Sequence, residues 1–477
     1  MPVNQADLGA TMTGESRLRR DALNASHIVA STLASIAPAM SFFFGFAVIV
    51  AGAGLAAPLT ILVATLVILF LTNTISEFSR FTPSTGSFVT FTGKAFGPSV
   101  GTAVSLFITF GYVVAASTVV SIAGTWVAET LQLFLGISVH WAIITILISA
   151  ATGWLVMRGV ALSTLWSGVF FYFEVGLLVL ASILMIVAHR SALTLAPFRV
   201  ANLSGGLRGL GAGFPLAIYL FIGWENSASL AEETENPRRD IPRALVTCAL
   251  AIGIFYMFLA YATAVGFNMD AHALGASQLP FIDGLKASAP SLLLVAYVAG
   301  VTSIFGSLIG LVNSQARILF NSGREGLLPE FLGKIHPQHQ TPHSALWVFL
   351  IIAVALILGF GLVGGVAPID YFGYAGTLGT IPIILVYMLT NLALPIYMIR
   401  YHRDELRIIR HILLPVTGAL IMFVPLWGLI QPGQLWPFNI FPWIVLGTMV
   451  VSAIYGMVLA HVSPGLAARI GVYVADQ

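Results

Sequence analysis

The chain has 477 residues, of which 58% are hydrophobic and only 8% are charged. A soluble domain carries roughly 25% charged residues, so this composition excludes a soluble fold. The formal net charge of +2 gives no support for nucleic-acid binding, and a single cysteine, Cys248, excludes an intrachain disulfide and a cysteine metal cluster.

Apolar residues gather in runs of about 18 to 28, long enough for a helix to cross a hydrocarbon core of roughly 30 Å. The runs lack the period-two alternation of barrel strands, so we predict an all-α membrane protein with about twelve spans. Residues 1–26 contain no short apolar segment with a cleavage site, which predicts a tail rather than a signal peptide. The predicted spans cover residues 27–52, 57–79, 99–127, 139–157, 163–188, 211–231, 243–267, 290–319, 344–364, 369–398, 411–430 and 437–461.

The positions of lysine and arginine predict how these spans are oriented. An even number of spans puts both termini on one side, and cytoplasmic loops carry the positive excess. Of the 21 lysines and arginines, all but Arg190, Arg199, Arg208 and Lys286 fall on the side of the termini. We therefore expect a multi-pass protein of the cell membrane with both termini in the cytoplasm. The residues on that side are Arg17, Arg19, Arg20, Arg80, Lys94, Arg158, Arg238, Arg239, Arg243, Arg317, Arg324, Lys334, Arg400, Arg403, Arg407, Arg410 and Arg469.

Two of the predicted spans are interrupted. The first contains SIAPAMS, in which Pro38 removes a backbone donor and disfavours helix at Ala37. The sixth contains FIGWENSAS, in which Gly223 precedes four polar or aromatic residues, and its apolar part is short. Broken backbone inside a membrane is tolerated only against protein or a water-lined cavity. Each string alone also fits a proline kink or close helix packing.

Interruptions in the first and sixth spans are typical of an inverted repeat of five plus five spans. Here the repeats would cover residues 27–188 and 211–398, followed by two further spans within 411–461. Residues 1–26 and 462–477 would then be cytoplasmic tails. Since substrate sites of such transporters lie at the interrupted helices, we predict a central site between the first and sixth spans.

Several strings resemble those of the amino acid–polyamine–organocation transporters. They are SEFSRFTPSTGSFVTF around Glu77, MRGVALS after the fourth span, FIGWENSASLAEETENPRRDIPRAL at the sixth, and NSQARILFNSGREGLLPEFLGKIHPQHQTPHSA between the eighth and ninth. The strings lie between residues 76 and 345, and the resemblance that they carry applies to the ten-helix core, residues 27–398. The resemblance implies a LeuT-type fold, with two five-helix inverted repeats, two peripheral helices and alternating access around a central site.

The resemblance also implies roles for particular positions. In that family, backbone amides of the unwound first helix hold the substrate carboxylate and carbonyls of the sixth hold its amino group, an arrangement that helix-end dipoles favour. An aromatic gate over the substrate corresponds to Tyr219. The substrate-binding positions that match are Ala37, Pro38, Ala39, Met40, Ser41 and Phe42 in the first helix and Phe221, Ile222, Gly223, Trp224 and Glu225 in the sixth.

The first break departs from the usual pattern of the family. Many members have a glycine-rich string there, whereas SIAPAMSF is bulkier and lacks one amide at Pro38. Some polyamine importers of the family also carry a proline near this point. We expect a secondary transporter of amino acids, with a polyamine or another organic amine as the alternative cargo. The sequence leaves the choice of substrate, the direction of transport and the oligomeric state open.

Glu174 lies near the middle of the fifth span, where an ionised carboxylate costs about 2.5 to 3.5 kcal/mol on insertion scales. Burial favours the protonated form of a carboxyl. Several sodium-independent relatives have a lysine near this position that stands in for a sodium ion, so a glutamate reverses the charge. We expect Glu174 to couple transport to a proton, or to bind a cation together with hydroxyls such as Ser303. A protonated carboxyl in a fixed interhelical hydrogen bond is the alternative.

Glu225 is the second acidic candidate, two residues after Gly223. It would be the counter-ion of an amine substrate, because a desolvated ammonium needs one. The alternative is a hydrogen bond that holds the break open. We expect the aromatic residues of the sixth and tenth spans to line the same pocket, namely Phe221, Trp224, Phe372 and Tyr374.

The remaining acidic residues suggest structural roles. Glu77 is expected to form an ion pair with Arg80. An acidic string and a basic string follow the sixth span, and we expect them to form a solvated loop that pairs within itself. Its members are Glu232, Glu233, Glu235, Arg238, Arg239 and Arg243.

An enzyme and a channel are the rivals from other functional classes. The sequence has no HExxH motif and no P-loop, and GLRGLGAG at 206–213 follows no strand. The string HPQHQTPH at 336–343 resembles the family's loop, and we expect no metal site there. No filter-like string or ring of charges supports a channel. We expect no catalytic residue, metal or cofactor, and the expected partners are an amino acid or amine, a coupling proton or sodium ion, and the lipid bilayer.

Overall fold

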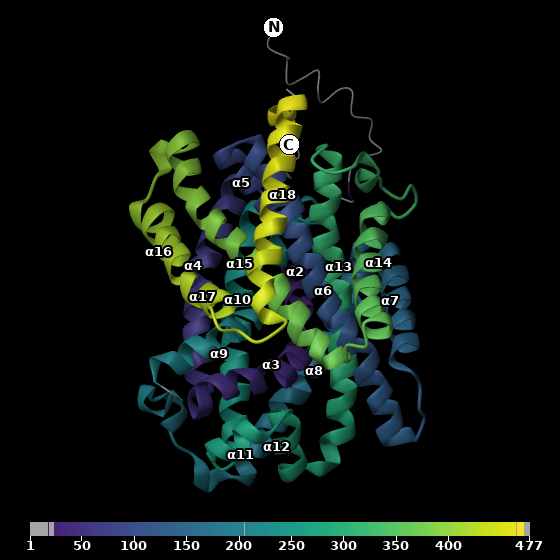
Figure 1. The fold of residues 1–477 in the computed structure, drawn as a ribbon, viewed down its shortest axis with the longest axis vertical. Coiled ribbons are helices and arrows are strands. Elements are labelled where there is room, and N and C mark those ends of the chain that lie inside the picture. The colour runs from purple at the N-terminus through teal and green to yellow at the C-terminus, as the bar shows by residue number, and fades with distance from the viewer. Residues whose placement is uncertain (1–17, 19–22, 205, 464, 472–477) are drawn as a thin grey trace.

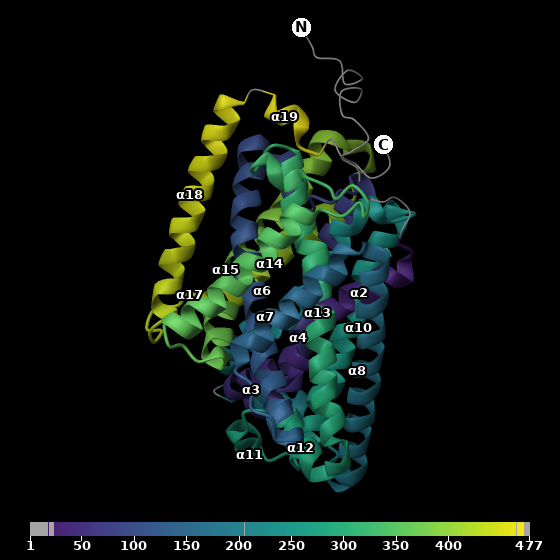
Figure 2. The same ribbon diagram turned by 90° about the vertical axis from the view of Figure 1, so that its right-hand side faces the viewer.

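The computed structural model describes residues 18, 23–204, 206–463 and 465–471. Within these residues the chain is an elongated bundle of helices (Figures 1 and 2). The predicted all-α membrane fold is confirmed, since nine helical stretches in this part of the chain are long and apolar enough to cross a membrane.

All twelve predicted spans correspond to helical segments. The stretch Ala25–Phe81 contains the first two, and the shorter apolar helix Trp141–Met157 is the fourth. The helices of the spans are α2 (Ala25–Ser35) and α3 (Pro38–Ala53), α4 (Ala57–Phe81), α6 (Pro98–Leu135), α7 (Trp141–Met157), α8 (Val160–Ala188), α9 (Leu207–Tyr219) with the 3₁₀ helix η6 (Trp224–Glu233), α10 (Pro237–Gly266), α13 (Leu293–Arg324), α14 (His343–Leu358), α15 (Pro368–Tyr401), α16 (Leu414–Ile421) with α17 (Phe423–Ile430), and α18 (Phe441–Val462). Short helices in the connections are α5 (Phe88–Phe96), α11 (Ala271–Ala276), α12 (Pro280–Ser288) and α19 (Leu466–Arg469).

The largest difference from the predicted boundaries is in α6. It has 38 residues and continues past the predicted end at 127 as far as Leu135. Emergence from the membrane does not by itself end a helix, because the backbone bonds remain satisfied in water. The helix ends at Gly136, whose φ of 67° is left-handed and suits a residue without a Cβ atom.

The long central helices pack in pairs, with α6 along α15, α8 along α13 and α4 along α10. The peripheral helix α18 packs on α6 and α15 and lies at the edge of the bundle in Figure 2. Its outer face is apolar and exposed, as shown by Trp443, which is 72% exposed. A large exposed apolar surface of this kind is stable only against lipid or protein, in keeping with a membrane-embedded bundle.

Both described ends of the chain lie at the same end of the bundle. Leu23 forms backbone hydrogen bonds with Glu233 and Glu235, and Arg238 next to them donates to the carbonyl of Arg80 at the end of α4. At the other terminus, α19 lies at the upper end in Figure 2, whereas α11 and α12 lie at the lower end. We call these the termini side and the α11–α12 side. An even number of spans explains the arrangement, while Arg17, Arg19, Arg20 and most of the two predicted tails lie outside the described residues.

The last described residues dock onto the termini side through Glu325, directly after α13. The amide of Gly471 donates to Oε1 of Glu325 at 2.9 Å. The Ile470 side chain fills a notch at Gly93, where an added Cβ would lie 2.8 Å from Cγ2 of Ile470. Burial raises the pKa of Glu325 to about 7, against an ordinary value of 4.5.

This shift predicts that stability falls as the pH rises through the interval from about 4.5 to about 7. The folded protein keeps the Glu325 proton in that interval while the unfolded chain loses it, and the effect is at most about 3 kcal/mol. Glu325→Gln should flatten this part of the stability profile, measured as melting temperature of the detergent-purified protein against pH. The exposed Glu330→Gln is the matched control and should keep the wild-type slope. Parallel profiles for wild type and Glu325→Gln would contradict the assignment.

Candidate functional site

The first break lies where the sequence predicts it. Helix α2 ends at Ser35, and Ala37 adopts left-handed backbone angles, with φ at 54° and ψ at 61°. Helix α3 then begins at Pro38, whose fixed φ and missing N–H suit a first helical position. A left-handed residue with a Cβ costs roughly 1 to 3 kcal/mol and persists only where its surroundings hold it in place.

The second break also follows the prediction. Helix α9 ends at Tyr219, a turn occupies 220–223, and the 3₁₀ helix η6 starts at Trp224. Gly223 has φ at 109°, which a side chain would disfavour. The chain thus changes direction at Gly223 inside the bundle.

Hydrogen bonds join the two breaks. The hydroxyl of Ser35 lies 3.4 Å from the Gly223 carbonyl and accepts from Nδ2 of Asn226 at 3.0 Å. One turn away, the hydroxyls of Thr32 and Ser227 are 2.9 Å apart. The carbonyl of Gly223 at the second break is therefore satisfied by a side chain of the first, and side-chain bonds join the two breaks further, as the interior of a membrane favours.

A small cavity of about 30 Å³ lies at the two breaks. That volume holds about one or two water molecules, so a ligand of several heavy atoms needs the cavity to widen. Its polar side chains are all neutral, and its other side chains are apolar. The cavity is lined by Ser35, Ile36, Ser41, Ala115, Ala116, Val119, Tyr219, Ile222, Ser307, Leu311 and Gln315.

Three of the predicted site residues line this cavity, namely Ser41, Ile222 and Tyr219. The aromatic residues expected beside them do not. Phe221 packs edge-on to Tyr256, with ring centroids 6.1 Å apart, and Trp224 packs against Tyr387 at 6.4 Å. The expectation that Phe221 and Trp224 line the pocket is therefore wrong for this conformation, because the turn at 220–223 rotates both rings into the helix packing.

The other predicted residues of the first helix form the first turn of α3. Ala37 and Pro38 lie at the break, and Ala39 and Met40 carry the amides that open the helix. Phe42 is buried against aromatic neighbours, stacking on Phe46 with ring centroids 4.7 Å apart. Apart from Ser41, which lines the cavity, this turn therefore offers backbone groups to the site.

Glu174 and Ser303 meet at this turn. Oε2 of Glu174 accepts from the amide of Ala39 at 3.2 Å, and the Ser303 hydroxyl lies 3.4 Å from the amide of Met40. Glu174 is fully buried. A carboxylate at a helix N-terminus is stabilised by the helix dipole and by the free amides. Two residues from α8 and α13 thus engage the amides to which the family resemblance assigns a substrate carboxylate.

Glu225 has a different position, at the second break and away from the cavity. Its Oε2 accepts from the Gly223 amide at 2.9 Å, and its Oε1 accepts from the hydroxyl of Tyr112 at 3.0 Å. Two donors from different elements fix this carboxyl in place. The contacts match the alternative in which Glu225 holds the break open.

Tyr219 forms one wall of the cavity. Its hydroxyl is 3.0 Å from that of Thr118 on α6, and its ring meets Phe372 of α15 edge-on at 6.2 Å. Phe372 therefore lies behind the cavity wall, without being one of the lining residues, and also contacts Phe44 at 5.6 Å. Tyr374 does not lie beside Tyr219, because it packs against Phe438 in the peripheral spans.

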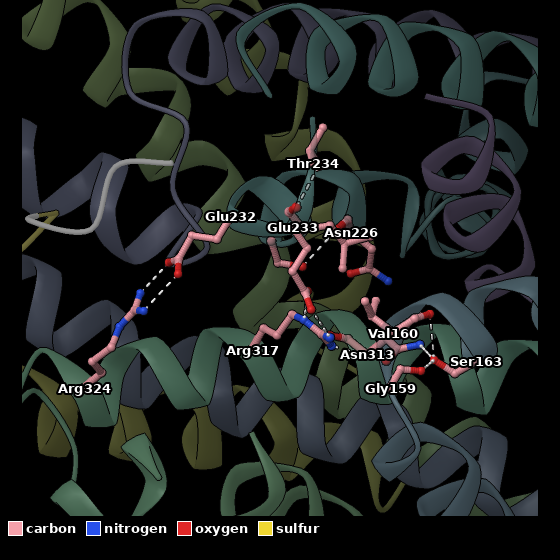
Figure 3. A network of polar contacts seen from close by, with 12 residues as sticks. Gly159, Val160, Ser163, Asn226, Glu232, Glu233, Thr234, Asn313, Arg317 and Arg324 are labelled. Carbon is pink, nitrogen blue, oxygen red and sulfur yellow. Dashed lines mark hydrogen bonds and ion pairs between the residues drawn. The ribbon is translucent and has the colours of Figure 1, made fainter. Parts of the chain in front are cut away.

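An ion-pair cluster that was not predicted from the sequence lies between the cavity and the termini side (Figure 3). Glu233 binds Arg317 with both carboxylate oxygens, and the Nη2 to Oε1 distance is 3.1 Å. Both side chains are only 1% exposed. Arg324 binds both oxygens of Glu232. The prediction of a solvated loop that pairs within itself is therefore wrong for Glu232 and Glu233, because η6 carries them into contact with α13.

The cluster extends to a third element. Arg317 also donates to the backbone and side-chain oxygens of Asn313, and Nδ2 of Asn313 donates to the Ser163 hydroxyl on α8 at 2.9 Å. Figure 3 shows these residues converging from η6, α13 and α8. A sequence signal did exist, since an arginine inside an apolar span requires a partner. The acid that pairs with it could not be chosen without the fold.

The expected pair of Glu77 and Arg80 is present, with Nη1 and Oε1 separated by 3.3 Å. Glu77 also lies 3.2 Å from Nε2 of His411 and 3.8 Å from Arg410. This second cluster ties α4 to the start of the eleventh span.

Aromatic side chains pack between the first break and the α11–α12 side. Phe43 of α3 stacks on Phe281 of α12, with ring centroids 5.5 Å apart, and approaches Trp126 of α6 at 5.7 Å. Trp126 in turn stacks on Tyr297 at 4.6 Å. The contacts toward the two sides of the bundle thus differ, since they are aromatic toward the α11–α12 side and ionic toward the termini side.

Comparison with known proteins gives the same picture over nearly the whole chain. A family model described as amino acid permease matches residues 25–475. The branched-chain amino acid permease BcaP of Bacillus subtilis is 24% identical over 479 residues, covering 93% of this chain and 95% of that protein. The methylthioribose transporter of Bacillus subtilis is 23% identical and covers 84% and 86%. The low-affinity putrescine importer PlaP of Escherichia coli is 31% identical over 175 residues, 33% of this chain and 35% of that protein.

The family model includes both breaks, the cavity and the ion-pair cluster. It confirms the resemblance drawn from the four sequence strings. Since its relatives are permeases, transporters and importers, the protein is a multi-pass membrane transporter of small molecules and not an enzyme. The chain belongs to the amino acid permease family.

Proposed function

We propose that this protein transports a small neutral amino acid with an aliphatic side chain. The observation that carries the proposal is the cavity at the two breaks, whose polar groups are hydroxyls and one amide and whose other walls are apolar. A zwitterion brings both charges with it and needs no counter-charge from the wall, whereas a desolvated cation needs one. An aliphatic side chain suits walls such as Val119, Ile222 and Leu311.

A polyamine is the second candidate, because PlaP is named as a putrescine importer and is 31% identical over its 175 matched residues. BcaP is 24% identical, but over 479 residues. The acids that could neutralise an amine are engaged elsewhere. Glu225 is held by the Gly223 amide and Tyr112, and Glu174 by the amide of Ala39. The almost full-length similarity to BcaP, named as a branched-chain amino acid permease, also favours the amino acid.

Glu174 gives this transporter a route to proton coupling. As an ionised carboxylate it takes the amide of Ala39, which the carboxylate of an amino acid would otherwise use. Protonation removes that charge and leaves the amide to the substrate, so proton and substrate bind together. The alternative is a cation bound between Glu174 and Ser303.

Transport would proceed by alternating access between the two covered ends. The ionic cover on the termini side would separate in one phase, and the aromatic cover on the α11–α12 side in the other. The positive residues of the predicted cytoplasmic loops support a cytoplasmic location of the termini side, with the protein in the cell membrane. The inverted repeats of 27–188 and 211–398 would supply the two broken helices, one each.

We expect purified protein in proteoliposomes to take up leucine, isoleucine or valine with saturation and counterflow. A panel of neutral, cationic and acidic amino acids and diamines at equal concentration should raise the melting temperature only for the neutral aliphatic group, because only bound ligands stabilise the folded state. Glycine and phenylalanine test the lower and upper size limits. Stabilisation by putrescine but not by leucine would overturn the proposal in favour of the amine.

Glu174→Gln imitates the protonated carboxyl and tests the coupling. The variant should still exchange amino acid across the membrane, but a proton gradient should no longer drive net accumulation, and uptake should lose its dependence on pH. The measurement is radiolabelled uptake and exchange in proteoliposomes between pH 5 and pH 8. The exposed Glu129→Gln on α6 is the control. If Glu174→Gln keeps the proton dependence of the wild type, the coupling role is excluded.

Arg317→Met should destabilise the protein by about 3 to 5 kcal/mol, because it leaves the Glu233 carboxylate buried without its partner. The double variant with Glu233→Gln removes both charges and should regain most of the loss, while remaining impaired in transport. Melting temperature and leucine exchange are measured together. Arg80, whose side chain is 51% exposed, supplies the control Arg80→Gln, expected to cost less than about 1 kcal/mol. Equal effects of Arg317→Met and Arg80→Gln would refute the buried pair.

A further inference from the structure

Gln315 is the lining residue whose polar atoms have no partner. Gln315 lies on α13, lines the cavity and is only 2% exposed. Neither Oε1 nor Nε2 has a hydrogen-bond partner within the described part of the chain. Buried side-chain amides are nearly always paired, so an unpaired one at a cavity wall calls for an explanation.

The other polar groups around the cavity are already engaged. The Ser41 hydroxyl donates to the Ile36 carbonyl at 2.6 Å, and the Ser307 hydroxyl donates to the Ser35 carbonyl at 3.0 Å. The Tyr219 hydroxyl pairs with Thr118 at 3.0 Å. These bonds hold the breaks in shape, so the amide of Gln315 is the polar group of the wall that is left for a ligand.

The position of Gln315 along α13 places it between the breaks and the ionic cover. Ser307 contacts the end of α2, and eight residues of helix carry the chain about 12 Å further toward the termini side. Gln315 then lies two residues before Arg317, which closes that side with Glu233. A substrate that moves between the central site and the termini side therefore passes this amide.

The chemistry of an amide suits a particular kind of substrate. It offers two N–H donors and a carbonyl acceptor with two lone pairs, and it carries no net charge. It can accept from an ammonium group and donate to a carboxylate, which a zwitterionic amino acid presents together. A cation alone would use only the carbonyl, and the neutral wall gives it no counter-charge.

We propose that Gln315 is a specificity-determining residue of the transport path, which binds the charged end of a zwitterionic amino acid between the two breaks and the Arg317–Glu233 pair. This inference rests on the proposed function, because it assigns a second contact to the same substrate. It makes Gln315 the residue that selects net-neutral substrates. A charge at this one position should redirect the selection.

Gln315→Met keeps the length of the side chain and removes the amide. The variant should raise KM for leucine about tenfold or more, as expected for a lost hydrogen bond to a charged group, and should weaken thermal stabilisation by leucine to a similar degree. The melting temperature without ligand should stay equal or rise, because an unpaired buried amide has been removed. Gln315→Asn, with a shorter side chain, is the second variant. Its KM for leucine should lie between that of Gln315→Met and that of the wild type.

Gln315→Glu tests the selection by charge. It should lower the preference for leucine over lysine or putrescine about tenfold, measured by competition for radiolabelled leucine uptake and by ligand-induced shifts in melting temperature. The exposed Gln132→Met at the far end of α6 is the matched control and should change neither KM nor preference.

The outcomes separate this inference from the proposed function. If the wild type transports leucine and both Gln315→Met and Gln315→Glu keep KM and preference within about twofold, Gln315 is only a structural side chain and the inference is overturned. If the wild type neither binds nor transports any amino acid of the panel, the proposed function fails, and the inference fails with it.

Discussion

Broken helices inside a membrane leave amides and carbonyls without intrahelical partners, and lipid cannot replace those partners. The rest of the site is arranged around this constraint. At the first break, Glu174 takes the amide of Ala39, and at the second break Glu225 takes the amide of Gly223. The Gly223 carbonyl and the Asn226 side chain bond across the gap to Ser35. The two acids that stand out in the sequence are therefore first of all ligands of free helix backbone, and any part in transport must work by giving up those bonds.

The two covered ends of the path differ in energetic character. Separating Phe43 from Phe281 exposes apolar rings to water, with a cost that depends on buried area. Separating Arg317 from Glu233 breaks a strong attraction but returns two charges to water, and the gain in hydration offsets much of the Coulomb energy. The net cost of opening can thus be small at the ionic end once water reaches it. Salt screens an exposed pair much more than a buried one.

The sequence predicts the helices and the breaks well because both depend on local properties. Apolar length predicts the spans, and Pro38 and Gly223 carry the backbone chemistry that interrupts a helix. The contacts across the bundle are harder to predict. Phe221 packs against Tyr256 and faces away from the cavity. This direction could not be predicted, because a turn, unlike a helix, has no fixed periodicity from which to read the direction of a side chain. Glu233 finds its partner 84 residues away, and no pattern in one sequence distinguishes that arginine from the basic residues next to the acid.

The 3₁₀ helix η6 connects the substrate site mechanically to the ionic end. Its ten residues are long for this geometry, whose hydrogen bonds are poorer than those of an α-helix and whose runs rarely exceed three or four residues. Near one end Asn226 bonds to Ser35 at the first break, and at the other end Glu233 bonds to Arg317. At about 2.0 Å per residue, these two contacts are roughly 14 Å apart along one element. The same short element therefore carries one contact to the first break and one contact to the buried ion pair. Because its hydrogen bonds are weaker than those of an α-helix, the backbone of η6 resists a change of shape less than its neighbours do.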